Sequence, residues 1–101
     1  MMLATYTHSG PASMWLNSTA QNALRAVLYI AEHGVEGPVR AADIARSLGC
    51  PSSYLSKTLH ALTRAGVLRS VGGRHGGFGL TAPARRLVVA RVVAPFQPSL
   101  E

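Results

Sequence analysis

The sequence predicts a mainly α-helical domain with one small β-hairpin near its C-terminal end. Apolar residues repeat at helical spacing in three segments before residue 66, and two short strand-like runs flank a glycine-rich stretch at 72–77. The chain has 101 residues, of which 48% are hydrophobic, so it suits one folded domain but not two. We expect a disordered lead over 1–13, the folded domain over 14–94 and a short tail over 95–101.

The first helix is predicted over residues 18–33. Asn17 or Ser18 can cap its N-terminus, because a short polar side chain at that position accepts a hydrogen bond from a free backbone N–H. Gly34 ends the helix, and a loop through Gly37 and Pro38 follows. The apolar residues that share one helical face, and that we expect to be buried, are Ala20, Ala23, Leu24, Val27, Leu28 and Ala31.

Two further helices follow, separated by a tight turn. The first is short, over 41–48, and Gly49 suits the position after its end because glycine readily adopts a left-handed backbone. The second covers 51–65, and Pro51 suits its first turn, where the N–H that proline lacks would have no helical partner. The residues expected to face inward are Ala41, Ile44, Ala45 and Leu48 in the short helix and Leu55, Leu59 and Leu62 in the longer one.

Residues 67–81 are predicted to form the hairpin. The strand-like runs are 67–71 and 78–81, with the glycine-rich tip between them, and Pro83 ends the second run. Residues 84–94 fit either a short helix or an extended segment, and Pro95 and Pro98 prevent a long helix beyond it. The apolar residues of this segment either cover the domain's own core or form a small surface patch: Leu87, Val88, Val92 and Val93.

Positive charge is concentrated in the second part of the chain. The ten Lys and Arg residues outnumber the four Asp and Glu residues, which gives a net charge of +6. Residues 40–101 contain nine of these bases but only Asp43 and Glu101 as acids, so this part alone carries +7. No acid occurs between Asp43 and Glu101. An acid-free stretch of this length that contains so many bases predicts an anionic partner, of which nucleic acid is the most common. The alternative is a basic surface that only keeps the protein in solution.

Helix, short helix, turn, helix and glycine-tipped hairpin is the element order of a winged helix-turn-helix domain. In that fold the helix at 51–65 enters the major groove of double-stranded DNA, with its leading end towards the bases. Ser52, Ser53 and Ser56 can form hydrogen bonds to bases or phosphates, and Lys57 can neutralise a phosphate. Arg74, at the tip of the hairpin or wing, can reach into a minor groove.

Other side chains of the same two elements complete the expected DNA-binding site. Arg64 is expected to contact the DNA backbone, and the histidines of the helix and the wing to approach phosphate. Tyr54 either contacts phosphate or packs inward. The full expected set is Ser52, Ser53, Tyr54, Ser56, Lys57, His60, Arg64, Gly73, Arg74, His75 and Gly76.

An ordered set of segments resembles the Rrf-two (Rrf2) family of bacterial winged helix-turn-helix regulators. They are LRAVLYIA at 24–31, ADIA at 42–45, Tyr54-Leu55 with Leu59 and Leu62, and AGVLRSV at 65–71. Gly73, Gly76, Gly77, Phe78 and Leu80 are similar to the family's wing pattern, Arg-Gly-x-x-Gly-Gly-Tyr-x-Leu. The resemblance covers residues 14–94. It implies a sequence-specific DNA-binding transcriptional regulator, expected to be a repressor, and relatives that include an iron–sulfur cluster assembly regulator and a cysteine-metabolism repressor.

Three positions depart from the family's pattern. Gly72 stands where the family often has the arginine that probes the minor groove, Asn22 where an aromatic residue is common, and Ser56 where a glutamate is frequent. We therefore expect a base preference that differs from that of the best-known members.

No cofactor, metal or catalytic activity is expected. The sensing members of the family bind an iron–sulfur cluster through cysteines beyond the wing, whereas no cysteine follows Cys50 here. Cys50 is either a buried structural thiol or a redox sensor. The glycine run lacks the Gly-Lys-Ser/Thr of a phosphate-binding loop, and no nucleophile has a recognisable base. The four histidines, which we expect to be solvent-exposed, have no metal-ligand spacing: His8, His33, His60 and His75.

The residues near the two ends of the chain give an expectation of where the protein is located and how it assembles. No signal peptide or membrane span is recognisable, so the cytoplasm is the default location. Family members dimerise through a long helix after the wing, and prolines interrupt the residues where that helix would lie. We therefore expect a truncated member that is a monomer or a weak homodimer. The rival hypothesis is a winged-helix module that binds protein, which the loss of the arginine at Gly72 favours.

Overall fold

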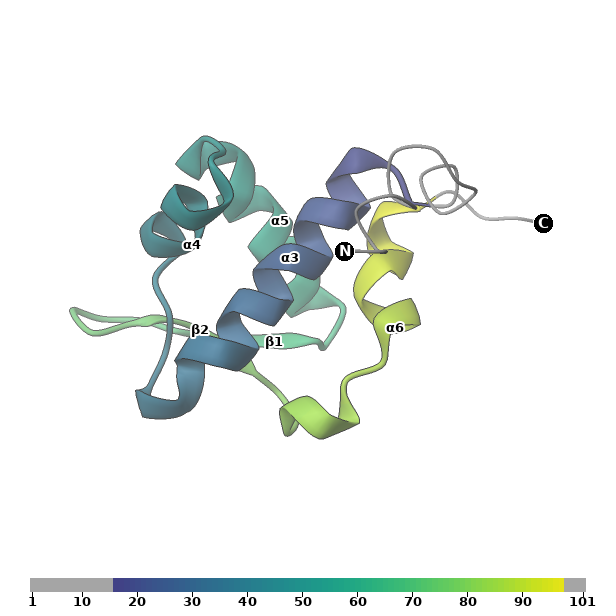
Figure 1. Ribbon diagram of the computed structural model, residues 1–101. Helices are drawn as coiled ribbons and strands as arrows, with labels where there is room; N and C mark the ends of the chain where they lie inside the picture. The colour runs from purple at the N-terminus through teal and green to yellow at the C-terminus, as the bar shows by residue number, and fades with distance from the viewer. Residues whose placement is uncertain (1–15, 98–101) are drawn as a thin grey trace.

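Helix α3 (Ser18–His33) is the central element of the structure, a computed structural model that describes residues 16–97 (Figure 1). Helices α4 and α5 pack on one side of it and α6 on another. The predicted lead over 1–13 and the last four residues of the predicted tail lie outside the described residues. The remaining elements are η1 (Gly34–Glu36), α4 (Ala41–Leu48), α5 (Ser52–Arg64), β1 (Leu68–Val71), β2 (Gly77–Leu80), η2 (Ala84–Arg86), α6 (Val89–Val93) and η3 (Ala94–Phe96).

Local sequence signals account for the ends of the helices. Asn17, not Ser18, caps α3, since its side-chain oxygen accepts a hydrogen bond from the Ala20 N–H at 2.8 Å. The Asn17 Nδ2 also donates to the Phe96 carbonyl at 2.7 Å, which joins the two ends of the described domain. Gly49 follows α4 in the left-handed conformation, with φ 73°, as expected for the residue after a helix.

The hairpin is a two-stranded antiparallel sheet in which Leu68 pairs with Leu80 and Val71 with Gly77. The loop before α4 adds a short third segment to it, because Val39 pairs with Phe78 in an antiparallel bridge. The two hydrogen bonds of that bridge measure 2.9 and 2.8 Å between N and O. The wing is therefore attached to the helical part along one edge.

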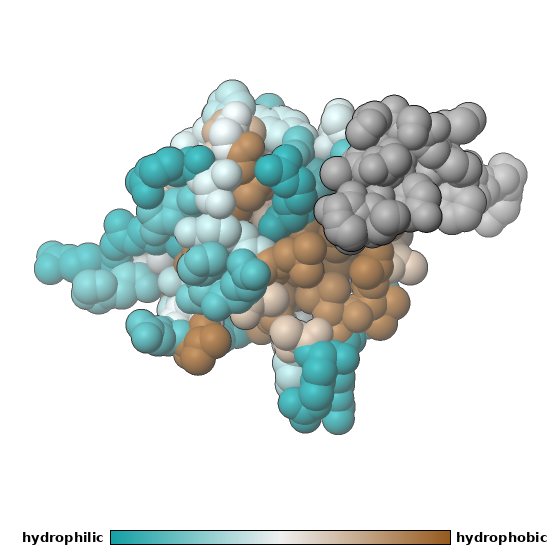
Figure 2. Space-filling view, in the orientation of Figure 1, coloured by the Kyte–Doolittle hydropathy of each residue, from teal (hydrophilic) through white to brown (hydrophobic). Residues whose placement is uncertain are grey.

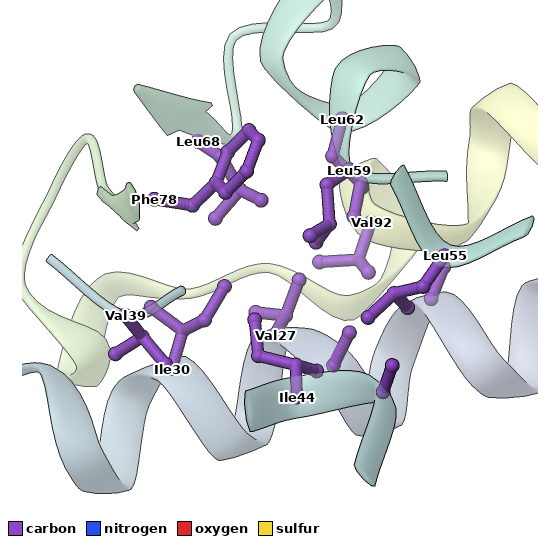
Figure 3. Close-up of a cluster of buried hydrophobic side chains, with 13 residues drawn as sticks. Val27, Ile30, Val39, Ile44, Leu55, Leu59, Leu62, Leu68, Phe78 and Val92 are labelled. Carbon is purple, nitrogen blue, oxygen red and sulfur yellow. The ribbon is translucent and has the colours of Figure 1, made fainter. Parts of the chain in front are cut away.

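One hydrophobic core lies between α3, α5, α6 and the hairpin (Figure 3). The predicted inner residues of α5 are fully buried, and those of α4 are buried or half-buried against the core. The predicted face of α3 is partly wrong: Leu28 is 50% exposed, while Ala26 and Ile30 are buried. Helix α3 contacts α4, α5, α6 and β2. Its buried surface is therefore wider than a single stripe of apolar residues, and it includes positions outside the predicted stripe.

Residues 84–94 fold into η2 and α6, and the apolar residues here have both expected roles. Val92 is buried in the core, and Leu87 packs against it half-buried. Val88 and Val89 are half-exposed, and the space-filling view shows an apolar area where α6 lies beside α3 (Figure 2). Within residues 16–97, no helix has both the length and the apolar character that a membrane span needs.

Candidate nucleic-acid interface

The turn between α4 and α5 sets the direction of the candidate recognition helix. The amides of Gly49 and Cys50 both donate to the Ala45 carbonyl, at 2.8 and 3.1 Å, which closes α4 tightly. Pro51 is the N-cap residue directly before α5, and its φ is −65°, the angle that its ring prefers. Helix α4 packs directly on α5, so the two helices form the helix-turn-helix pair that the sequence predicts.

Helix α5 has a buried face and a polar exposed face. Leu55, Leu59 and Leu62 are fully buried, and Thr58 lies among them with its hydroxyl donating to the Tyr54 carbonyl at 3.4 Å. Ser56 is half-buried. The predicted site residues of this helix that are exposed are Ser52, Ser53, Lys57, His60 and Arg64. The exposed face thus has short hydrogen-bonding side chains at its leading end and basic side chains further along.

Tyr54 bridges the recognition helix and α3. It is half-buried, and its hydroxyl accepts a hydrogen bond from the Asn22 Nδ2 at 3.3 Å. Asn22 is the position at which this chain departs from the family's aromatic residue. The tyrosine therefore has a structural partner inside the protein, which fixes how the leading end of α5 lies against α3.

The wing brings the second set of predicted residues to an exposed tip. Gly73, Arg74 and His75 are exposed, and Gly76 is half-buried. Gly73 has φ +94°, which glycine adopts without strain, and its carbonyl accepts a hydrogen bond from the Gly76 N–H at 3.1 Å. A Cβ on Gly76 would lie 2.1 Å from the Val71 carbonyl oxygen, so the tight turn requires glycine there.

A ring contact connects the wing to the recognition helix. His60 of α5 meets Phe78 of β2 edge-on, with ring centroids 5.6 Å apart and an interplanar angle of 73°. Phe78 is buried and is the residue that pairs with Val39, so this part of the hairpin is anchored from two sides. The base of the wing is consequently packed against α5, and the exposed face of α5 lies next to the hairpin.

Sequence reasoning missed Arg40, which also belongs to this surface. Its guanidinium donates a hydrogen bond from Nη2 to the carbonyl of Arg74 at the wing tip. Arg40 lines an open groove of about 480 Å³ between the end of α3, the start of α4 and the wing, together with His33, Glu36 and His75. The two arginines are 34 positions apart in the chain, and no local pattern relates them.

The exposed face of α5 and the wing contain no carboxylate, whereas Glu36 and Asp43 line the groove beside the wing. The one ion pair among residues 16–97 joins Arg46 and Asp43 within α4, at 3.2 Å, and the two side chains are 76% and 46% exposed. Such a pair contributes little to stability. Lys57, Arg64 and Arg74 have no carboxylate partner within that range, so their charges remain available to an external anion.

The donor residues of this chain do not fit an iron–sulfur cluster. Cys50 is the one cysteine of the sequence, and it lies half-buried in the turn between α4 and α5, packed against the core. A cluster normally needs several thiolates, usually four. In the part of the chain that the structure describes, no three His, Cys, Asp or Glu side chains come together as metal ligands.

Comparison with known proteins relates the chain to transcriptional regulators. A family model described as Rrf2, iron-dependent transcriptional regulator, matches residues 16–101. The chain is 38% identical over 88 residues to the HTH-type transcriptional regulator IscR of Xenorhabdus nematophila, which covers 87% of this chain and 54% of that protein. It is 39% identical over 80 residues to the protein rrf2 of Nitratidesulfovibrio vulgaris, covering 79% of this chain and 53% of that protein. The chain thus spans about half the length of these relatives.

Solved structures have the same fold. The structure of IscR from T. potens superposes with a TM-score of 0.75 at 29% identity, covering 85% of this chain and 63% of that one. CymR, the global cysteine regulator of B. subtilis, superposes with a TM-score of 0.75 at 21% identity, covering 79% of this chain and 62% of its own, and supports the fold alone. The winged helix-turn-helix fold and the family expected from the sequence are both confirmed. The chain belongs to the Rrf2 family of transcriptional regulators.

Proposed function

We propose that this chain is a sequence-specific DNA-binding module of a transcriptional regulator, and that the regulator is a repressor. The observation that carries the proposal is the surface formed by the exposed face of α5 and the wing tip. It combines the exposed serines of the helix with Lys57, Arg64 and Arg74, which have no carboxylate partner among the described residues. Unpaired bases beside short hydrogen-bonding side chains are what a phosphate backbone and base edges require.

In the proposed complex α5 lies in the major groove. Ser52, Ser53 and Ser56 face base edges, while Lys57 and Arg64 contact the phosphate backbone. We propose that Tyr54 and His60 each approach a phosphate. The wing contacts the minor groove or the backbone through Gly73, Arg74, His75 and Gly76. Arg74 enters the minor groove, because the negative potential of a narrow groove attracts arginine. A regulator of this kind acts where the genome is, so we propose the bacterial cytoplasm as its location.

Binding to random duplex DNA over a series of salt concentrations tests this function. Each neutralised phosphate steepens the plot of log K against log salt by about 0.9, so four contacts would give a slope near −3.6, an order-of-magnitude expectation. Selection of bound fragments from a random pool then gives the preferred site and shows whether it is palindromic. A chain that binds no DNA at low salt would refute the proposal.

The same titration separates DNA binding from the rival function, a winged-helix module that binds protein. Gly72 favours the rival, because the arginine that family members often place before the wing glycine is missing. The unpaired basic surface favours DNA, because a protein-binding face has no general reason to exclude acids. We propose DNA as the partner, because the basic surface is the stronger of these two observations.

A further inference from the structure

We propose that Arg40 is the positioning residue of the wing: it holds the backbone at Arg74 so that the Arg74 side chain is presented to DNA. The inference rests on the proposed function for its effect on DNA, but its structural half can be measured without DNA. Arg40 precedes α4, the first helix of the helix-turn-helix pair. Its hydrogen bond to Arg74 therefore connects the start of the helix-turn-helix pair to the wing.

The backbone beside Arg40 is already attached to the wing. Val39 and Phe78 exchange two hydrogen bonds, so the 37–40 loop is paired with β2 at this one residue. Figure 1 shows the loop crossing the hairpin on its way to α4. The approach is so close that a Cβ on Gly77 would lie 2.5 Å from the Val39 carbonyl oxygen. This attachment brings the Arg40 side chain within reach of the tip.

Beyond that bridge, the tip has few other restraints. Residues 72–75 are all exposed, and the turn is closed by one backbone hydrogen bond between Gly76 and Gly73. Exposed hairpin tips with few buried contacts open at low free energy. The hydrogen bond from the charged Arg40 guanidinium to the Arg74 carbonyl is of the stronger, charge-assisted type, and it acts at the middle of the tip.

Two carboxylates line the same groove as Arg40, those of Glu36 and Asp43, but neither forms an ion pair with it. Asp43 lies one turn further along and lines the same groove, but its carboxylate is paired with Arg46. Arg40 is thus committed to the wing although a carboxylate is close by. Without it, Arg74 would have to be ordered when DNA binds, and ordering a mobile side chain and its backbone weakens binding.

A double-mutant cycle tests the inference. Arg40→Ala is expected to weaken binding to the selected site by about three- to tenfold in the natural sequence, and to cause almost no further loss in an Arg74→Ala background. Arg85→Ala is the matched control, because it removes the same charge from an exposed position of η2, outside α5 and the wing, and leaves the Arg46–Asp43 pair intact. Equal losses from Arg40→Ala in both backgrounds would overturn the inference and make Arg40 an independent phosphate contact, which would also flatten the salt slope by about 0.9.

Backbone amide relaxation of the free protein tests the structural half. In Arg40→Ala the order parameters at residues 73–76 should fall towards the flexible range, below about 0.6, whereas Arg85→Ala should leave them unchanged. Unchanged order parameters in Arg40→Ala would refute the positioning role even if DNA binds. If the natural chain binds no DNA, the proposed function fails, and this measurement still decides whether Arg40 holds the tip.

Discussion

Lys57 and Ser53 stand on the same exposed face of α5, but they can contribute differently to DNA binding. A lysine is a mobile point charge that recognises phosphate and carries no sequence information. A serine is short and uncharged, so it affects binding through a hydrogen bond to a group that it touches directly.

Substitutions at these two residues should separate affinity from preference. Lys57→Ala is expected to weaken binding to all sequences alike and to flatten the salt slope by about one unit. Ser53→Ala should mainly reduce the preference for the selected site over random DNA. Salt-dependent titrations on both kinds of DNA measure the two effects. The assignment is wrong if Lys57→Ala changes the preference while Ser53→Ala changes only the slope.

Gly77 should be the least replaceable residue of the wing after Gly76. Its φ is +157°, and an added Cβ would meet the Val39 backbone at 2.5 Å, so Gly77→Ala must displace either the hairpin or the 37–40 loop. We expect a loss of about 1–3 kcal/mol in the free energy of unfolding. Gly72→Ala is the matched control, because nothing lies within 4 Å of a Cβ there. Chemical denaturation compares the two, and similar losses would contradict the close approach.

Residue patterns predicted the exposed face of α5 but not its connection to the rest of the site. The leucines of α5 are all buried, and their spacing alone placed the serines and bases on the other side. Arg40 and Val39 could not be found in this way, because each acts through a partner more than 30 positions away. Thr58 was missed for another reason: its hydroxyl is satisfied by the Tyr54 carbonyl, so a residue of polar type can be buried.

At the scale of the elements, helix ends were easier to predict than helix faces. The ends depend on local chemistry, such as Gly49 in its left-handed conformation and the proline at the start of α5. The buried face of α3 depends on what surrounds it, and α6 arrives from a distant part of the chain. A short apolar segment such as 84–94 gives no clear period, so its helix could not be distinguished from a strand.

The cap of α3 provides a test at this scale. Asn17→Ala removes both the cap to Ala20 and the hydrogen bond to Phe96, whereas Ser18→Ala removes neither. We expect Asn17→Ala to lower the free energy of unfolding by about 1–2 kcal/mol, and Ser18→Ala to change it by less than about 0.5 kcal/mol. Thermal melts followed by circular dichroism measure both variants. A larger effect at Ser18 would mean that the cap is assigned to the wrong residue.

For the whole molecule, the cysteine count makes a prediction about cofactors. The purified chain should be colourless after anaerobic reconstitution with iron and sulfide, because one half-buried thiol cannot replace the several thiolates of a cluster. The measurement is the visible absorbance together with iron and sulfide analysis. Stoichiometric iron and sulfide would require a cluster shared between chains through Cys50, and Cys50→Ser would then abolish the colour.

Assembly is the second prediction at this scale. Helix α6 has five residues, and the half-exposed Val88 and Val89 offer only a small apolar patch. A stable interface needs roughly 1,000 Å² of buried surface. We therefore expect a protein of these 101 residues to be a monomer or a weak homodimer that binds half-sites poorly. Light scattering over a concentration series measures this, and a dimer that persists at nanomolar concentration would show a larger interface.

The hydrogen bonds of Asn17 with Phe96 and Gln97 matter for the design of fusion proteins that contain this domain. They bring the start of α3 and the end of η3 to one corner, and Figure 1 shows that corner on the opposite side of the molecule from the wing tip. A fluorophore, a purification tag or a second domain attached at residue 16 or residue 97 would start from this corner and would not lie between the wing and its target. The same closeness of the two ends would let the segment 16–97 be inserted as a cassette into a surface loop of another protein.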